Sequence, residues 1–303
     1  MLKPLTKKLL ILGTLLGCTV VSAQNQVGAG MPEALKDIKP ASGVCRRDAP
    51  EQTSNTAQTS SMAWAPDLSC ALDGSELARM LGQPGVVVVD TRTSQSFNAF
   101  RIADALNLDV ANLRQKTFLY DKTVILAGSG KGERELYSAC AALKAQGFKR
   151  VSVLRGGMAA WAAQGLPALG RASDAGLMEG LSSAELWVES QFDANLLLIV
   201  RERVDMLSQL KSGVEIVSAS PEALSSMLAR YRKANRNALP AALLLVAAAP
   251  LPAEDLQKLR QAIKPVPLLM YADKTEAYVR YLKQQQAVWA AQALGPKQLG
   301  CGL

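Results

Sequence analysis

The sequence predicts an α/β protein built on two parallel β-sheets, and three observations lead to that fold class. Unbroken apolar runs, such as residues 86–89, are typical of strands that a parallel sheet buries on both faces. Segments with helix start and stop signals alternate with these runs. The same order of segments occurs twice, about 110 residues apart, which is the spacing of domains rather than of short structural repeats.

The first half begins near Leu68. Asp73 and Glu76 match a capping box, because the Asp73 carboxylate can accept a hydrogen bond from the Glu76 backbone while Glu76 reaches back. We therefore expect a helix there, ended by residues 83–85 and followed by the strand over 86–89. A βαβ unit then follows, with a strand over 124–127, a helix over 133–146 that Gly147 caps, and a strand over 151–154.

The second half repeats this pattern over residues 181–294. Ser182 and Glu185 form a second capping box, and apolar runs over 196–200, 243–246 and 266–270 correspond to the three strands of the first half. Another capping box, Asp273 with Glu276, opens a helix that reaches about residue 291. We expect a linker over 170–180 and a tail over 295–303; an unrelated α/β domain is the alternative to a duplication.

The N-terminus is typical of an exported protein. Residues 1–23 combine three lysines, a short apolar core over 9–16 and a small-residue cleavage site, so we expect a signal peptide and a periplasmic or secreted protein. The sequence around Cys18 also resembles a lipobox, so a membrane-anchored lipoprotein carrying its lipid on Cys18 is the alternative. Residues 24–67 contain a polar tract and are expected to be a flexible extension.

Composition limits the classes of function. The chain contains no histidine, the commonest general base and zinc ligand, so we expect no metal site, and we expect no cofactor. The net charge of +8 falls to about +5 without the signal peptide, and no basic run is interleaved with aromatic residues, so nucleic acid is not an expected partner. We expect no transmembrane span in the mature chain, because the apolar core of the signal peptide is too short.

Four cysteines remain after export: Cys45, Cys70, Cys140 and Cys301. An even number in an oxidising compartment permits disulfides. Cys45 and Cys70 flank a polar stretch, so a bridge between them would attach the extension to the first domain. Cys140 lies among alanines in the middle of a predicted helix and is expected to be a buried free thiol. The sequence assigns no partner to Cys301.

Several motifs of the first half resemble one known family. Residues 151–167 combine a strand, the corner Gly156-Gly157, a helix with Trp161 and a Gly-Leu-Pro stop, which resembles the end of a rhodanese (sulfurtransferase) domain. Upstream, VVVVDTR over 86–92 resembles the family's first central strand, and RIADALNL over 101–108 resembles its GHIPGAINI segment. The resemblance covers residues 68–169. It implies two rhodanese-like domains with helices on both sides of each sheet, the second degenerate.

The resemblance also shows a departure from the family. VILA over 124–127 resembles the strand that delivers the catalytic cysteine, but Gly128 stands at the cysteine's position. The family moves sulfane sulfur from a donor such as thiosulfate through a cysteine persulfide. Ser129 cannot form a persulfide, and Cys140, about two turns along the helix, is expected to point away. The resemblance thus implies the fold of a sulfurtransferase with no catalytic residue, as in a pseudoenzyme.

The loop that begins at Gly128 keeps features of an anion site. Gly128, Gly130 and Gly132 let backbone N–H groups converge, Ser129 lies between them, and Lys131 and Arg134 add positive charge. Sulfate, phosphate or an acidic side chain of a partner would suit such a loop; a solvated turn without a ligand is the alternative. Asp90 and Arg92, at the end of a strand, predict either a structural salt bridge or a pair that orients a ligand.

Three hypotheses of function follow. The first is a non-catalytic binding or assembly module of the cell envelope, with an envelope protein as its partner, so that the balance is against an enzyme. The second is a sulfurtransferase or thiol-redox enzyme that uses a relocated cysteine. The third is an anion or phospho-ligand sensor that binds through the loop over 128–134.

Overall fold

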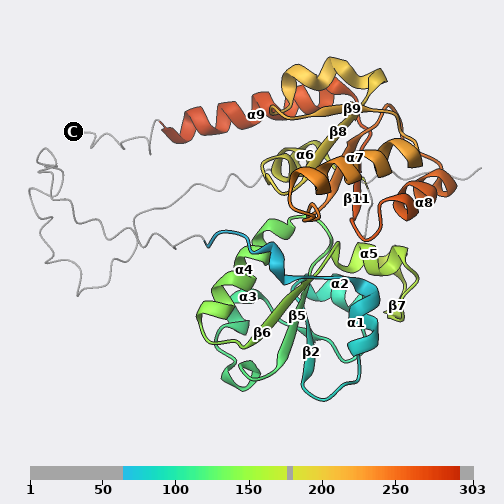
Figure 1. The fold of residues 1–303 in the computed structure, drawn as a ribbon. Helices are drawn as coiled ribbons and strands as arrows, with labels where there is room; N and C mark the ends of the chain where they lie inside the picture. The colour runs from blue at the N-terminus through green and yellow to red at the C-terminus, as the bar shows by residue number, and fades with distance from the viewer. Residues whose placement is uncertain (1–63, 176–179, 294–303) are drawn as a thin grey trace, which may run out of the picture. The chain divides into compact units, whose positions relative to one another are not determined.

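The computed structural model describes residues 64–175 and 180–293 (Figure 1). All of them belong to one compact unit, which spans residues 57–299. The predicted signal peptide, the tail over 295–303 and most of the extension over 24–67 lie outside the described residues. Cys18, Cys45 and Cys301 lie outside them as well.

The first sheet has five parallel strands in the order β1-β6-β5-β2-β4. Their bounds are β1 Ala71–Leu72, β2 Val86–Asp90, β4 Leu106–Asn107, β5 Thr123–Ala127 and β6 Arg150–Leu154. The central pair is in register from Val86 opposite Thr123 to Asp90 opposite Ala127. Because the strands are parallel, β2 and β5 end at the same edge of the sheet. Asp90 lies opposite Ala127 there, and Gly128 is the next residue of the chain.

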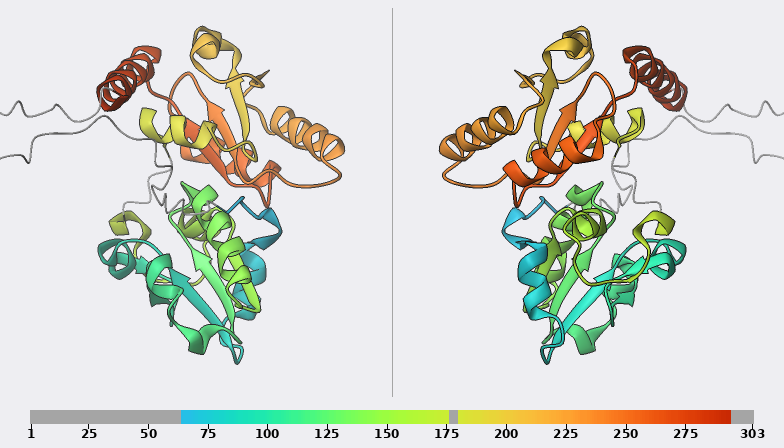
Figure 2. Two further views of the ribbon diagram at one scale, coloured as in Figure 1. Left: turned by 90° about the vertical axis from the view of Figure 1, so that its left-hand side faces the viewer. Right: turned by 90° about the vertical axis from the view of Figure 1, so that its right-hand side faces the viewer.

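Helices cover both faces of this sheet (Figures 1 and 2). One face packs against α3 and α4 in a core that includes Leu113, Leu126 and Leu143, and the other packs against α1 and α5 in a core that includes Leu77 and Trp161. The helices are η2 Leu68–Cys70, α1 Gly74–Met80, α2 Ser94–Ala99, α3 Val110–Leu113, η3 Thr117–Leu119, α4 Glu133–Ala145, α5 Gly157–Ala163 and η4 Ala172–Ala175.

The second sheet repeats this topology, with the order β11-β10-β8-β9 and parallel pairs throughout. A single parallel bridge between Gly180 and Met270 stands where β1 pairs with β6 in the first sheet. The strands are β8 Leu196–Val200, β9 Glu215–Val217, β10 Leu243–Val246 and β11 Leu268–Tyr271. The predicted fold class, two α/β units with central parallel sheets, is confirmed.

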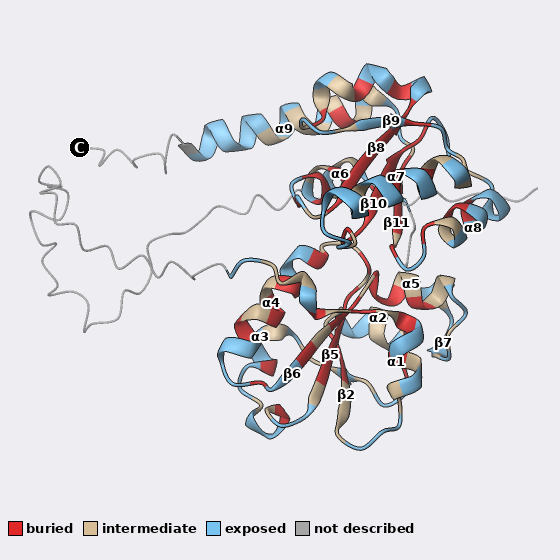
Figure 3. Cartoon of the chain, in the orientation of Figure 1, coloured by how far each residue is buried: buried red, intermediate tan, exposed pale blue. Residues whose placement is uncertain are grey.

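Helices again cover both faces of the second sheet. One face packs against α7 and α8, and the other against α6, η5 and α9. Their bounds are α6 Ser183–Ser190, η5 Arg201–Gln209, α7 Pro221–Ala234, α8 Ala253–Ala262 and α9 Thr275–Ala293. Strands β8, β10 and β11 are buried along their whole length (Figure 3), which explains why their sequences are apolar without alternation.

The capping predictions differ in outcome. The box of Ser182 and Glu185 is confirmed, since each side chain bonds the other's backbone N–H, at 3.3 and 2.8 Å. The box predicted at Asp73 is wrong. Asp73 is the N-cap of α1, but its carboxylate accepts a hydrogen bond from Arg155 Nε at 3.0 Å and none from the helix backbone. A tertiary ion pair has taken the place of the local cap.

The predicted linker over 170–180 is partly structured. Strand β7, Leu169–Gly170, pairs antiparallel with β3, Phe100–Arg101, and η4 follows it. Gly170 has φ of 87°, and a Cβ there would lie 2.0 Å from the Ala99 carbonyl oxygen. Glycine at this position therefore permits a close approach of two backbones, and the linker as far as Ala175 packs on the first half.

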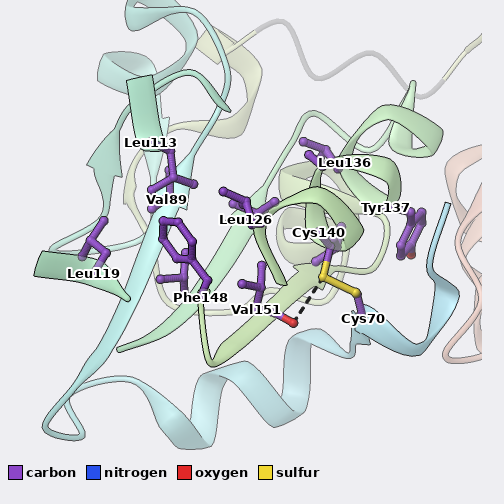
Figure 4. Packing of buried hydrophobic residues seen from close by; sticks show 14 of the residues in the cluster. Cys70, Val89, Leu113, Leu119, Leu126, Leu136, Tyr137, Cys140, Phe148 and Val151 are labelled. Carbon is purple, nitrogen blue, oxygen red and sulfur yellow. Dashed lines mark hydrogen bonds between the residues drawn. A yellow bond between two sulfur atoms is a disulfide. The ribbon is translucent and has the colours of Figure 1, made fainter. Parts of the chain in front are cut away.

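Cys70 forms a disulfide with Cys140, with the two Cα atoms 6.6 Å apart (Figure 4). The predicted bridge from Cys70 to Cys45 and the predicted free thiol at Cys140 are therefore both wrong. The pairing arises because η2 and β1 run along the sheet edge next to β6, and α4 covers that edge. In the oxidised pair, Cys140 Sγ carries no proton and lies 3.4 Å from the Val151 carbonyl oxygen.

Removing this disulfide should destabilise the first half. The bridge closes a loop between residues 70 positions apart, so chain-entropy arguments give a loss of about 2–4 kcal/mol in the free energy of unfolding. Urea unfolding of a Cys70→Ser/Cys140→Ser variant measures the loss. A reductant should lower the midpoint of the wild type and leave that of the double variant unchanged. Equal midpoints for the wild type with and without reductant would contradict the bridge.

Candidate functional site

The loop over residues 128–132 connects β5 to α4 and forms the centre of the candidate site. The first turn of α5 holds it: Met158 N donates to the Gly128 carbonyl oxygen at 2.8 Å, and Ala159 N donates to that of Ser129 at 3.1 Å. The loop is thus fixed by the start of the helix that carries Trp161.

Glycines make this close packing possible. A Cβ on Gly157 would lie 2.5 Å from both Gly128 O and Gly130 N, and a Cβ on Gly130 would lie 2.4 Å from Gly156 O. All three nearest atoms are backbone, which cannot move aside as a flexible side chain can. Gly130 and Gly157 also have positive φ, of 105° and 52°. The Gly156-Gly157 corner and the loop therefore fit together only as glycines.

Lys131 projects from the loop toward the second half of the chain. Its Nζ donates to the Gly180 carbonyl oxygen at 2.7 Å and to Glu185 Oε1 at 3.0 Å. Burial alone would raise the pKa of Glu185, but the hydrogen bonds from Ser182 and Lys131 outweigh it and lower that pKa. The Lys131 charge is therefore balanced by a carboxylate at the start of α6.

A second carboxylate of α6 accepts a hydrogen bond from the backbone of the loop. Glu189 Oε1 accepts from Gly132 N at 2.5 Å, and its Oε2 accepts from Asn195 Nδ2 at 2.9 Å. Glu189 is 5% exposed. Burial raises its pKa, and the neighbouring Glu185 acts in the same direction, while the two donors oppose the rise. The N–H group of Gly132, just before α4, thus already binds a carboxylate of the same chain.

Glu133, the first residue of α4, is also buried. Burial raises its pKa to about 8, and the charge of Glu189 contributes to the rise; the Gly156 N–H group, Arg155 and Tyr137 oppose it. Tyr137 Oη lies 3.4 Å from Glu133 Oε2, while Oε1 has no hydrogen-bond partner within the described ranges. A carboxyl with this pKa is mainly protonated at neutral pH.

A cavity of about 480 Å³ opens on the outer side of the loop. Charge and hydrogen-bonding groups come to its lining from both sides of the loop, and its polar residues are Thr91, Arg92, Thr93, Ser96, Ser129, Lys131, Glu135 and Glu185. Arg92 and Asp90 form a bidentate ion pair, with Nη2 2.6 Å from Oδ2 and Nε 2.9 Å from Oδ1. The Arg92 side chain is 5% exposed, and its Nη1 has no hydrogen-bond partner in the described part of the chain.

The structure brings together only part of the predicted anion loop. Gly128, Ser129, Lys131 and Gly132 line the cavity, whereas Gly130 packs on Gly156. Arg134 is exposed and does not line the cavity; it contributes to lowering the pKa of Asp193, which Lys211 lowers most. Cys140 is held in the disulfide with Cys70 and does not line the cavity.

Sequence reasoning missed three residues of this site: Glu133, Glu185 and Glu189. Glu185 was assigned only to a helix cap, which it also forms. Its spacing of four residues from Glu189 places both carboxylates on one face of α6, and this was the available signal. Nothing in the sequence indicated that this face meets the loop of the other half.

Residues 64–175 and 180–293 contain neither a metal-binding cluster nor a membrane-spanning helix. No group of three or more acidic or cysteine side chains is arranged to hold a metal ion. None of the helices in this part of the chain combines the length and the apolar character that crossing a membrane requires.

The buried Glu133 should make stability depend on pH. Its folded-state pKa of about 8 lies above the ordinary value of 4.5, so the unfolded chain loses this proton first. The stability that Glu133 contributes is therefore fully present below about pH 4.5 and is lost as pH rises toward 8, by a few kcal/mol at most. Glu133→Gln should remove most of this slope in urea unfolding between pH 5 and 8.

Glu135→Gln is the matched control, since Glu135 is exposed two residues further along α4. It should keep the wild-type slope. A wild-type stability that stays constant or rises over pH 5–8 would contradict a buried, protonated Glu133.

Comparison with known proteins places the first half in a family. A sequence profile described as Rhodanese-like domain matches residues 73–164. A protein named Sulfurtransferase from Allochromatium vinosum is 37% identical over 99 residues, which are 32% of this chain and 91% of that protein. Thiosulfate sulfurtransferase GlpE from Pseudomonas savastanoi pv. phaseolicola is 34% identical over 91 residues, which are 29% of this chain and 83% of that protein.

Solved structures are also similar. The crystal structure of the Alr3790 protein from Anabaena sp. has 26% identity and a TM-score of 0.30, covering 33% of this chain and 93% of its own. That of thiosulfate sulfurtransferase from Pseudomonas aeruginosa has 14% identity and a TM-score of 0.30, covering 70% and 42%. On the identity of the two sulfurtransferase relatives and their near-complete coverage, the chain belongs to the rhodanese-like family.

Proposed function

We propose that this protein is an exported, non-catalytic member of the rhodanese-like family that acts as a binding or assembly module in the cell envelope. The observation that carries the proposal is the loop after β5. It begins with Gly128, where the resemblance places the nucleophilic cysteine, and its donors already bind carboxylates of the same chain. The proposal treats the fold as a recognition surface rather than as a sulfur carrier.

The surroundings of Gly128 support the absence of a side chain there. A Cβ at this position would lie 2.7 Å from Leu136 Cδ1, and Leu136 belongs to the core between α4 and the sheet. A cysteine would therefore require this leucine to move. The end of the Leu136 side chain, which also lines the cavity, thus lies where a side chain at position 128 would project.

The cysteines of the described residues give little support to the sulfurtransferase alternative. Cys70 and Cys140 are 2% and 0% exposed and are joined to each other, so neither offers a thiolate to a sulfur donor. A relocated nucleophile would have to be released by reduction or come from another part of the chain. The names of the relatives keep this alternative open at the level of the family.

The first test is sulfur transfer from thiosulfate to cyanide by the purified mature protein, with a thiol count in native and denaturing buffer. We expect no turnover above background, because none of the described residues places a thiolate next to the cavity. Cys70 and Cys140 should remain unreactive toward thiol reagents until the protein is both unfolded and reduced.

Turnover that a single cysteine-to-serine substitution abolishes would overturn the proposal and identify the relocated nucleophile. The thiosulfate sulfurtransferase GlpE of Pseudomonas savastanoi pv. phaseolicola is a suitable positive control for the assay. An inactive protein would direct the search to partners captured from envelope extracts.

The third hypothesis, an anion sensor, is favoured by one specific observation. Arg92 lines the cavity beside Lys131, and its buried Nη1 lacks a partner within the described residues. Glu185 competes for Lys131 in the present arrangement. Because that ion pair is partly exposed, at 18% for the lysine and 39% for the glutamate, it is worth only about 1 kcal/mol or less.

Removing Glu185 should therefore strengthen binding of an anion at the loop. Sulfate is the probe, and the change in melting temperature with sulfate, at constant ionic strength set with chloride, reports binding. Glu185→Ala should bind sulfate up to about fivefold more tightly than the wild type, because Lys131 is released. Adding Lys131→Ala should abolish this gain.

Glu202→Ala is the control, as Glu202 is exposed in η5 and does not line the cavity. It removes the same charge without releasing Lys131. Equal sulfate binding by the wild type, Glu185→Ala and the double variant would end the sensor hypothesis, while the proposal of a non-catalytic module would stand.

A further inference from the structure

A second cavity, of about 380 Å³, lies away from the loop's outer side. Its walls come from four segments: the start of α1, Lys131 of the β5–α4 loop, the helix α5 with Arg155 before it, and the end of α8 with the chain that leads to β11. This volume falls within the range of cavities that bind small organic molecules.

The floor of this cavity is apolar. Ala159, Ala160 and Ala163 line it from α5, and Val266 and Pro267 line it from the segment before β11. The small alanine side chains leave the space open. These surfaces offer an organic molecule apolar contact rather than hydrogen bonds.

Close packing ends the cavity beside Gly156. A Cβ on Gly156 would lie 2.9 Å from the Cβ of Pro267 and 2.6 Å from that of Ala160. The two apolar walls therefore meet at this glycine.

The polar groups of the lining are mainly cationic. Arg155, Arg260, Lys264 and Lys131 line the cavity, and Asp73 is the acid among its described lining residues. Asp73 is neutralised by Arg155, whose Nε lies 3.0 Å from its Oδ1. The cavity thus has an excess of positive charge.

Lys264 is the cation best placed to receive a ligand. It is exposed, and it makes no ion pair or hydrogen bond within the described part of the chain. Three glutamine side chains, Gln164, Gln257 and Gln261, are exposed around the same cavity and add amide donors and acceptors. An apolar floor, an unpaired ammonium group and amides favour one class of molecule.

We propose that this cavity binds a small organic acid with an apolar body, whose anionic group lies against Lys264 while the body covers the alanines of α5. An inorganic anion would leave the apolar floor in contact with water, and a neutral apolar molecule would leave the Lys264 ammonium group without a counterion. This binding site is distinct from the cavity on the outer side of the loop at Gly128, although Lys131 lines both, and it goes beyond the proposed function.

The probe for the test is 1-anilinonaphthalene-8-sulfonate, which joins an aromatic body to a sulfonate. Calorimetric titration of the mature protein should show one saturable site per chain. The uncharged N-phenyl-1-naphthylamine, with almost the same body, should bind up to about fivefold more weakly, since one exposed charge contact is worth up to about 1 kcal/mol.

Two variants locate the site. Lys264→Gln should weaken sulfonate binding about fivefold and leave binding of the uncharged probe unchanged. Ala163→Phe should abolish binding of both probes by filling the floor. The matched controls are Lys283→Gln and Ala290→Phe, both at exposed positions of α9 outside the cavity lining, and both should bind as the wild type does.

Three results would overturn the proposal: no saturable binding, equal affinity for the charged and uncharged probes, or binding that Lys264→Gln and Ala163→Phe both leave intact. Lys264 is exposed, so its variant is expected to fold even where Ala163→Phe does not, and it decides the question alone. The thiosulfate assay has no bearing on any of these outcomes.

Discussion

The contact between two glycine-rich turns is the constraint on which the rest of the site depends. The β5–α4 loop and the β6–α5 corner meet so closely that a Cβ on Gly130 or Gly157 would overlap backbone atoms. The first N–H groups of α5, at Met158 and Ala159, satisfy carbonyl groups of the loop. With the loop held in this way, the Gly132 N–H group and the Lys131 side chain face the other half of the chain.

The second half supplies side chains that accept hydrogen bonds donated by this loop. Its sheet has the same strand order as the first, but the glycine corner is replaced by Tyr271 and Ala272, so it carries no equivalent loop packing. Its contribution is helix α6, which supplies Glu189 to the Gly132 N–H group and Glu185 to Lys131. Buried carboxylates need such donors, since an unpaired buried charge costs several kcal/mol. The two halves are therefore coupled through charge as well as through apolar contact.

The central strands were predictable because they are buried on both faces. A run such as 243–246 is apolar at every position, as a strand in the middle of a parallel sheet requires. The loop's location was predictable for the same reason. What the sequence could not provide were contacts across long separations: Cys70 with Cys140, Asp73 with Arg155 and Gly132 with Glu189. In each case the sequence predicted a local arrangement: a bridge to a nearby cysteine, a helix cap or an open loop. The residue instead contacts a partner that is distant in the sequence and that only the fold brings close.

Lys131 connects the two cavities of the structure, because it lines both of them. Its ammonium group has three donors, and the Gly180 carbonyl oxygen and Glu185 use two. An anion arriving from either cavity would compete with Glu185 for a weak, partly exposed ion pair, whereas Glu189 stays fixed by two buried hydrogen bonds. A ligand that binds Lys131 would therefore replace its ion pair with Glu185 while the hydrogen bonds of Glu189 stay in place.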